Sequence, residues 1–507
     1  MIDLLIVTAP FTYTFGPSLA PALLKSCVTK QGLSAQTWDI SAEFNLHSDS
    51  SHYQNVKNWM VFPELKLTVE EYNWYQSLVK SYAEKICQHY QPKNLAISLL
   101  TMNSHRFAED LCYHVRTHCA DIKIILGGSG LDIFQYQYQM PWHDLLLTSG
   151  LADTVILGEG EFALGKAIID NQFGVIKVPQ LTNTELDQIP VPDYDDYDFS
   201  LYQTYTKSYW MSREDVKKSS ELIFLITASK GCVKNCSFCD VGKIWGKYRF
   251  RSGIKVAEEM IHVYQRYGAK YFSFTDSLMN GGMKVFQELN HTLTERLPRT
   301  ISYEGQIICR SQRDMPEKHF DLMSQAGCKN VSVGIESGSE KVRMHMGKGS
   351  AQNDVHYTTG MLIKYGINQT WNIIAGYPTE TDEDWQSTMD LIKHWLPISQ
   401  GSLWIAPIST FLLLDGTPIN DTNEYNNLGL EKSTINGYSG FAWTSSVNPE
   451  NTFDCRCNRF LELCHYLLDH DPVRYSYVKE KIKTTNKQLQ WYQNEHKSKK
   501  VFVISGS

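Results

Sequence analysis

The chain has 507 residues, of which 48 are Lys or Arg and 55 are Asp or Glu, so its formal net charge is −7. Hydrophobic residues make up 42% and charged residues 20%, which excludes global disorder and fits about three folded domains. The negative charge argues against general nucleic-acid binding, and no apolar run approaches the roughly 18 residues of a membrane span.

The N-terminal segment 1–7 has the acidic residue Asp3 where a signal peptide would need Lys or Arg, and it is apolar enough to be a first strand. We therefore expect a cytoplasmic protein. Its 12 cysteines are then expected to be reduced thiols or metal ligands, because disulfides are rare in that compartment.

Residues 1–180 alternate short apolar segments with helical ones. Strands are predicted at 4–7, 37–40, 95–100, 122–126 and 154–157. Short buried strands separated by helices are typical of a doubly wound parallel sheet with helices on both faces. We therefore predict an α/β fold that begins with a Rossmann-like domain over residues 1–180, carrying an insertion rich in Tyr and Trp at 46–92.

A linker is predicted at 181–215, because residues 189–198 combine two prolines with four Asp and favour an extended conformation. A second alternating series, over residues 216–420, has predicted strands at 222–227, 271–275, 303–309, 330–335, 369–375 and 403–409. Six such strands predict a partial (β/α)6 barrel whose chemistry lies at the C-terminal strand ends.

Residues 421–507 are predicted to form a mainly helical C-terminal domain. It contains Cys455, Cys457 and Cys464, whose spacing fits no auxiliary metal cluster. We expect these three cysteines to be buried thiols of the helical domain.

The densest group of reactive side chains is Cys232, Cys236 and Cys239, spaced C-x3-C-x2-C directly after a predicted strand. A tight loop points such thiolates at one place, which suits three irons of a [4Fe–4S] cluster and leaves the fourth iron without a protein ligand. A structural zinc site would want a fourth ligand, and residues 240–259 contain no Cys or His. Buried thiols without a metal are the remaining alternative.

This motif, with Phe238 just before the third cysteine, resembles that of the radical S-adenosylmethionine (SAM) enzymes over about residues 221–420. The resemblance implies that the open iron binds the amino and carboxylate groups of SAM. It also implies that an electron from the cluster cleaves SAM to methionine and a 5′-deoxyadenosyl radical. Lys230 stands where many relatives carry Arg.

The resemblance also gives roles to residues at later strand ends. It implies Asp276 near the SAM amino group, Arg310 near its carboxylate, Glu336 and Ser337 along ribose and methionine, and Gly376 and Tyr377 near adenine. The residue types fit these roles, since a cation suits a carboxylate and glycine permits close approach. Taken singly, Glu336 would be better explained as a helix cap and Arg310 as a surface ion pair. Their order behind the three cysteines reverses that preference.

In the N-terminal domain, one strand end carries an S-x-L motif and the next a glycine pair. Their spacing resembles that of the cobalamin-binding domain of cobalamin-dependent radical SAM enzymes. The residues concerned are Ser98, Leu100, Gly127 and Gly128, with Thr101, Gly158, Glu159 and the segment 8–17 as further candidates near the corrin. The D-x-H-x-x-G motif is absent, so no histidine is expected below the cobalt. A Rossmann-like domain without a cofactor is the alternative.

Together the resemblances imply a cobalamin-dependent radical SAM enzyme that methylates an unactivated carbon. The alternatives are a radical SAM cyclase or rearrangement enzyme without methyl transfer, and a non-catalytic cofactor-binding protein. The implied partners are a small-molecule or peptide substrate and an external electron donor such as flavodoxin or ferredoxin.

Overall fold

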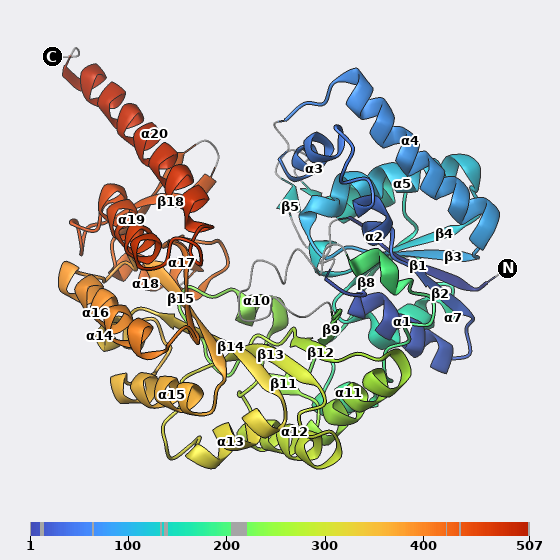
Figure 1. The fold of residues 1–507 in the computed structure, drawn as a ribbon. Coiled ribbons are helices and arrows are strands. Elements are labelled where there is room, and N and C mark those ends of the chain that lie inside the picture. The colour runs from blue at the N-terminus through green and yellow to red at the C-terminus, as the bar shows by residue number, and fades with distance from the viewer. Residues whose placement is uncertain are drawn as a thin grey trace. The chain divides into compact units, whose positions relative to one another are not determined.

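The computed structural model describes residues 2–10, 15–62, 65–131, 134–135, 140–203, 221–421, 423–435 and 438–504 (Figure 1). The chain divides into two compact units, Met1–Ile226 with Glu258–Ser273, and Thr227–Ala257 with Phe274–Ser507. Within the described ranges, no helix has the length and apolar character needed to cross a membrane.

The first unit contains a six-stranded sheet in the order β2-β1-β3-β4-β7-β8, and all five neighbouring pairs are parallel. Its strands are β1 Leu4–Thr8, β2 Ala35–Trp38, β3 Asn94–Ser98, β4 Lys123–Gly127, β7 Thr154–Leu157 and β8 Gly174–Lys177. The predicted doubly wound sheet is confirmed, with β8 as an additional edge strand. The strand order reverses between β1 and β3, and sheets of this topology bind ligands beyond the C-terminal ends of such a pair.

Alternate side chains of each strand enter two separate hydrophobic cores, because successive strand residues point to opposite faces. Leu5 and Val7 lie in the larger core, with residues of α4 and α5. Leu4 and Ile6 lie in the smaller core, with residues of α1 and α7. Burial on both faces explains why these strands are continuous apolar runs in the sequence.

The helices of this unit include those of the aromatic insertion. They are α1 Leu19–Lys30, α2 Ile40–Asn45, α3 Tyr53–Val61, α4 Val69–Lys85, α5 His105–His118, α6 Trp142–Thr148, α7 Gly160–Ile169 and α8 Asn183–Gln188, with single turns at Ile86–Tyr90, Met102–Ser104, Ser129–Leu131 and Phe199–Tyr202 and a short ribbon of β5 Phe134–Gln135 and β6 Met140–Pro141. α4 begins at a capping box, in which Thr68 and Glu71 satisfy each other's backbone N–H groups. The insertion thus folds onto the sheet as part of the larger core.

The acidic segment predicted as a linker is anchored to the first unit over its described part. The buried ammonium of Lys25 lies 3.2 Å from an Asp193 oxygen and 2.7 Å from an Asp196 oxygen. Asp196 also accepts a hydrogen bond from the backbone N–H of Thr37 at 2.8 Å. The Asp residues therefore attach an extended chain to the sheet edge, while 204–220 lies outside the described residues.

A second six-stranded sheet has the order β16-β15-β14-β13-β12-β9, with β13 to β16 paired in parallel. Its strands are β9 Ile223–Ile226, β12 Tyr271–Phe274, β13 Ser302–Ile307, β14 Cys328–Glu336, β15 Asn368–Ala375 and β16 Leu403–Thr410, and its helices are α11 Gly253–Tyr267, α12 Met283–Arg296, α13 Glu317–Gln325, α14 Glu340–His345, α15 Gln352–Lys364 and α16 Asp382–Ile398. The six predicted strands are confirmed. β9 and β16 are the two edges, so the sheet is open, as expected of a partial barrel.

The C-terminal region is mainly helical, as predicted, and also contains an antiparallel hairpin. Its elements are α17 Pro418–Asp421, α18 Asn423–Asn427, β17 Leu430–Ile435, β18 Tyr438–Ser445, α19 Phe453–His470 and α20 Val478–Ile504. Cys457 and Cys464 are fully buried on α19, whereas Cys455 is partly exposed. The domain boundaries expected from the sequence stay predictions.

Candidate active site

Cys232, Cys236 and Cys239 lie in one loop between β10 (Ser229–Lys230) and α10 (Val241–Trp245). β10 pairs with β11 (Arg249–Phe250), and Cys232 forms a bridge to Lys247, so a short ladder closes the base of the loop. Gly231 has a φ of 79°, and a β-carbon there would lie 2.9 Å from the Lys247 carbonyl oxygen. This position therefore requires glycine.

Ser237 fixes the middle of the cysteine loop through all of its polar groups. Its N–H donates to the Met346 carbonyl at 2.9 Å, and its carbonyl accepts from the N–H of Ile419 at 2.7 Å. Its hydroxyl lies 2.8 Å from the Tyr377 hydroxyl. Three separate segments thus hold Ser237, which directly follows Cys236.

The three thiols are partly buried. Burial raises the pKa of Cys236 to about 11 and raises the pKa of Cys239. Such thiols are metal ligands only as thiolates, so a bound metal would have to displace their protons. Among the described residues, no three Cys, His, Asp or Glu side chains are already gathered around one point.

A buried ion pair lies beside the loop at the end of β14. Glu336 has a φ of 62°, which non-glycine residues rarely adopt, and its Oε1 lies 2.8 Å from Lys348 Nζ. The Lys348 ammonium is 5.9 Å from the centroid of the Phe238 ring. Burial acts to lower the pKa of Lys348, but the Glu336 carboxylate, together with Cys236 and Cys309, holds the pKa above its usual value.

Lys348 was missed by sequence reasoning, which placed no site residue in the turn after α14. A β-carbon at Gly334 would lie 2.3 Å from Lys348 Nζ and 2.5 Å from Glu336 Oε1, so the ion pair covers that glycine. Gly334, two residues before the predicted Glu336, was the available signal that a side chain packs there.

Asp276 and Arg310 both hold backbone in place. Asp276 is buried, and its carboxylate accepts from the N–H of Ala228 at 2.9 Å and from the Ser229 hydroxyl at 2.5 Å. Burial raises the pKa of Asp276 to about 6. The Arg310 guanidinium donates to the Asn280 carbonyl at 2.6 and 3.0 Å, and burial lowers its pKa. Their roles toward SAM stay predictions.

Ser337 is also buried at the end of β14, where its carbonyl accepts from the guanidinium of Arg343 at 2.8 Å. Arg343 itself is fully buried and donates to Ser350 and Gln352 as well. This arginine therefore ties the turn after β14 to the start of α15.

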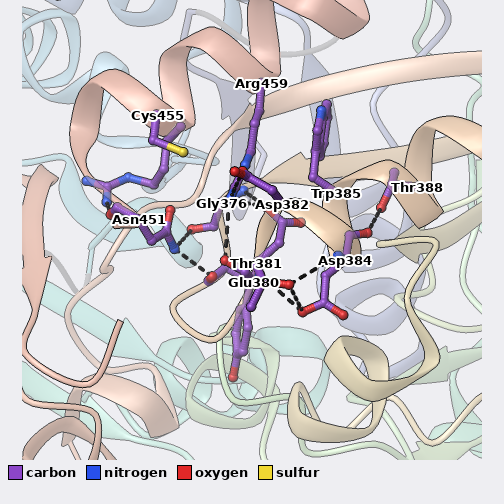
Figure 2. A network of polar contacts seen from close by, with 12 residues as sticks. Gly376, Glu380, Thr381, Asp382, Asp384, Trp385, Thr388, Asn451, Cys455 and Arg459 are labelled. Carbon is purple, nitrogen blue, oxygen red and sulfur yellow. Dashed lines mark hydrogen bonds and ion pairs between the residues drawn. The ribbon is translucent and has the colours of Figure 1, made fainter. Parts of the chain in front are cut away.

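The loop after β15 is held by a network from α19 and the residues just before it, shown in Figure 2. Glu380, which is fully buried, accepts from the N–H of Gly376 at 2.6 Å and lies 3.2 Å from an Arg459 nitrogen. Asn451 donates to the Tyr377 carbonyl at 2.8 Å. Burial raises the pKa of Glu380 to about 7, although Arg459 acts against this.

Gly376 is required where the loop meets α19. Its φ is 81°, and a β-carbon would lie 2.2 Å from Arg456. Arg456, Arg459 and Asn451 were not predicted as site residues, since their partners lie about 70–80 positions earlier in the sequence. The C-terminal region thus fixes the conformation of Gly376 and Tyr377.

At the C-terminal edge of the first sheet, the backbone leaves no room for a side chain at Gly128, whereas there is open space beside Gly127. A β-carbon at Gly128, whose φ is 116°, would lie 2.1 Å from the Leu99 carbonyl oxygen. A β-carbon at Gly127 would meet nothing within 4 Å. Ser98 ends the adjacent strand, and Leu100 is 43% exposed. Small and apolar groups therefore border an open edge.

Among the residues that the structure describes, three hydroxyls near this edge are buried without a hydrogen-bond partner: Thr8 Oγ1 at the end of β1, and Thr101 Oγ1 and Ser104 Oγ after β3. Buried hydroxyls are normally paired, so these atoms fit a polar ligand at the switch point between β1 and β3. The residues present are therefore compatible with a large bound group. Within the expected segment 8–17, residues 11–14 lie outside the described ones.

Gly158 and Glu159 are engaged by the protein itself. A β-carbon at Gly158 would lie 2.7 Å from the Val178 carbonyl oxygen, and Glu159 accepts from the N–H of Leu181 at 2.7 Å. The structure therefore assembles the predicted site residues in two groups. One group surrounds the cysteine loop in the second unit, and the other borders the sheet edge in the first.

The comparisons with known proteins agree with this architecture. Residues 226–392 match the family model of the Radical SAM superfamily. Anaerobic magnesium-protoporphyrin IX monomethyl ester cyclase of Synechocystis sp. is 22% identical over 338 residues, which cover 64% of each protein. Bacteriochlorophyllide d C-12(1)-methyltransferase of Chlorobaculum tepidum is 29% identical over 191 residues, covering 37% of this chain and 41% of that one. The chain spans less than two thirds of each of these relatives.

Two solved structures share the fold over most of the chain. The radical SAM methyltransferase TsrM from Kitasatospora setae has a TM-score of 0.60 at 15% identity, covering 86% of this chain and 82% of its own. The cobalamin-dependent radical SAM enzyme OxsB has a TM-score of 0.60 at 13% identity, covering 98% of this chain and 71% of its own. The chain therefore contains a radical SAM domain, and it shares its fold with TsrM and OxsB.

Proposed function

We propose that this protein is an enzyme that cleaves SAM reductively at a [4Fe–4S] cluster and uses cobalamin to methylate an unactivated carbon. The observation that carries the proposal is the three-cysteine loop in a radical SAM domain, joined in one chain to a parallel sheet with an open C-terminal edge at Gly127. When bound, the reduced cluster supplies the electron that breaks SAM, and cobalamin supplies the carrier of the methyl group.

The residues of the second unit have distinct tasks in this proposal. Cys232, Cys236 and Cys239 hold three irons, and Ser237 keeps their loop in one conformation. Glu380 and Asn451 fix the backbone at Gly376 and Tyr377. This backbone contacts the nucleoside of SAM in one defined conformation. Such preorganisation lowers the entropy cost of aligning the reacting groups.

The residues of the first unit hold the corrin and its nucleotide tail. Gly127 leaves room for the tail, and the unpartnered hydroxyls of Thr8, Thr101 and Ser104 supply hydrogen bonds to polar substituents. The structures of TsrM with cobalamin and a [4Fe–4S] cluster and of OxsB with aqua-cobalamin and SAM support this assignment through their shared fold.

A second candidate is radical cyclisation or rearrangement without methyl transfer. It is favoured by the similarity to magnesium-protoporphyrin IX monomethyl ester cyclase, which extends over 338 residues. Both candidates need an external one-electron donor, for which flavodoxin or ferredoxin is proposed.

The test uses the full chain, reconstituted anaerobically with iron and sulfide and loaded with hydroxocobalamin. Iron content and the corrin spectrum report the two cofactors, and 5′-deoxyadenosine formed under reduction reports SAM cleavage. SAM with a deuterated methyl group separates the candidates, because methyl transfer to cobalamin leaves S-adenosylhomocysteine and labels the corrin. Formation of 5′-deoxyadenosine without S-adenosylhomocysteine would favour the second candidate, and failure to bind iron would refute both.

A further inference from the structure

The segment that carries the three cysteines is strongly basic, in a chain whose formal net charge is −7. Between residues 230 and 251, six residues are Lys or Arg and one, Asp240, is acidic. The six basic residues are Lys230, Lys234, Lys243, Lys247, Arg249 and Arg251. A local concentration of one charge creates a field that steers a partner of the opposite charge.

The buried and the exposed members of this basic segment differ in what they bind. Arg249 and Arg251 are buried, and each donates to a backbone carbonyl, at 3.1 and 3.0 Å, so their charges serve the fold. Lys243 and Lys247 are exposed, and Lys234 is partly exposed. Among the residues that the structure describes, none of these three ammonium groups forms an ion pair. Their charges are therefore available to a partner.

Asp415, which lies near Lys243, is already bound by another lysine. Its carboxylate is 2.6 Å from Lys432 Nζ and accepts from the Asn420 amide at 2.8 Å. The hydrogen bond from Lys432 is the main cause that holds the pKa of Asp415 below its usual value, and Lys243 adds to it. One carboxylate shared by two lysines leaves the charge of this surface positive.

Exposed apolar side chains accompany the lysines. Val233 is 44% exposed and directly precedes Lys234, and Ile244 is 53% exposed and directly follows Lys243. Protein interfaces combine such apolar groups with a polar rim, whereas nucleic-acid sites depend on many phosphate contacts. We call Val233, Lys234, Lys243, Ile244 and Lys247 the α10 surface.

The α10 surface is continuous with the cysteine loop. Val233 and Lys234 directly follow Cys232, the Lys247 backbone bridges to the same cysteine, and α10 begins two residues after Cys239. Electron transfer slows steeply with distance, so a donor protein must dock beside the residues that hold the cluster. The α10 surface meets that requirement.

We propose that the α10 surface docks an acidic electron-carrier protein that reduces the cluster. The inference rests on the proposed function, because that function needs an external one-electron donor. One electron passes from the reduced carrier to the oxidised cluster, so the carrier is oxidised by one electron and no bond forms or breaks. Charge complementarity of this kind mainly raises the association rate, and salt weakens it.

The test measures 5′-deoxyadenosine formation by the full, reconstituted chain with different reductants. Reduced flavodoxin and reduced ferredoxin are the acidic carriers, and reduced methyl viologen is a small cation that a basic surface does not attract. At limiting carrier, the rate is expected to fall steeply between about 50 and 300 mM salt, because exposed charges are then screened. With methyl viologen no such fall is expected.

Two variants separate the charged and apolar parts of the α10 surface. Lys243→Glu is expected to lower kcat/KM for the carrier about 10-fold at low salt, measured against the methyl viologen rate and iron content of the same variant. Ile244→Ser is expected to raise the KM for the carrier several-fold and to keep the salt dependence, since no charge changes. Lys318→Glu, at an exposed position of α13, is the matched control and should behave like wild type.

Several outcomes would overturn the α10 surface. They are a wild-type rate for Lys243→Glu with both carriers at low salt, and failure of both carriers in wild-type protein that is active with methyl viologen. An equal loss with all reductants would assign Lys243 to the cluster or to SAM, and a dimer formed by wild type but not by Lys243→Glu would assign the surface to a second copy. Absence of 5′-deoxyadenosine with every reductant would instead overturn the proposed function, and the docking role with it.

Discussion

The two groups of candidate residues differ in how their polar atoms are satisfied. Around the cysteine loop, Asp276, Arg310 and Glu336 already bind partners from the same unit. At the edge of the first sheet, by contrast, the hydroxyls of Thr8 and Thr101 are buried without partners in the described part of the chain. The three named side chains of the first group are therefore bound to the protein itself, whereas a ligand would complete the hydrogen bonds of the two hydroxyls in the second group.

The largest expected effect comes from removing one thiol of the cysteine loop. Cys236→Ala leaves only two thiolates for the cluster, so we expect loss of the iron–sulfur spectrum and a fall in 5′-deoxyadenosine formation by at least about 10³-fold. Cys455→Ala, on α19, is the control and should retain both. Normal 5′-deoxyadenosine formation by Cys236→Ala would contradict the assignment of the loop.

The next largest effect is expected at the edge of the first sheet, where cobalamin is proposed to bind. Gly127→Leu places a side chain in the open space at the sheet edge, so we expect loss of cobalamin retention with an unchanged cluster. Gly127→Ala, whose β-carbon meets no atom within 4 Å, should fold normally and retain part of the corrin. Absorbance spectra after anaerobic loading and desalting report both cofactors together. Full retention of corrin by Gly127→Leu would place the ligand elsewhere.

Much of this architecture was predictable from local sequence. Buried strands such as β1 and β9 are apolar runs, and the three cysteines that suggest a metal site share one loop. β8 escaped prediction because its four residues alternate between intermediate and exposed positions at the sheet edge.

The contacts that shape the site were not predictable in the same way. Arg459 and Glu380 are 79 positions apart, and Tyr377 and Ser237 are 140 apart. No local periodicity records such pairs, since they exist only once α19 and the cysteine loop have packed against the turn after β15. Residue type also did not reveal that both carboxylate oxygens of Asp276 accept hydrogen bonds from the segment before the cysteine loop.

The buried carboxyl of Glu380 makes a pH-dependent contribution to stability. Its pKa is raised from 4.5 to about 7 by burial, so the folded protein keeps a proton that the unfolded chain releases within that window. Stability contributed by this group is therefore present below about pH 4.5 and is lost as the pH rises toward 7. Glu380→Gln does not titrate, so its unfolding free energy relative to wild type should rise by about 3 kcal/mol across the window.

The measurement is thermal or denaturant unfolding of both proteins at several pH values. Glu317→Gln is the control: hydrogen bonds from Lys364 and Tyr365 lower the pKa of Glu317 from 4.5, so its contribution changes only below the window and the variant should follow the wild-type profile within it. A Glu380→Gln variant whose stability follows the wild-type pH profile would show that another group titrates in this window.

The smallest effect sharpens the contrast between satisfied and unsatisfied hydroxyls within the first unit. Thr154 Oγ1 is buried and donates to the Gln172 carbonyl at 2.8 Å, so Thr154→Val should lower the unfolding free energy by about 1–2 kcal/mol. Thr101 Oγ1 is buried and has no partner within the described ranges, so Thr101→Val should change the unfolding free energy by less than about 0.5 kcal/mol. Cobalamin retention should respond in the reverse order, falling several-fold in Thr101→Val and staying at the wild-type level in Thr154→Val, because only the unpartnered hydroxyl is available to the ligand.

Unfolding of the corrin-free proteins and corrin absorbance after desalting measure the two responses independently. Equal corrin retention by both variants would mean that the hydroxyl of Thr101 serves no ligand at this edge.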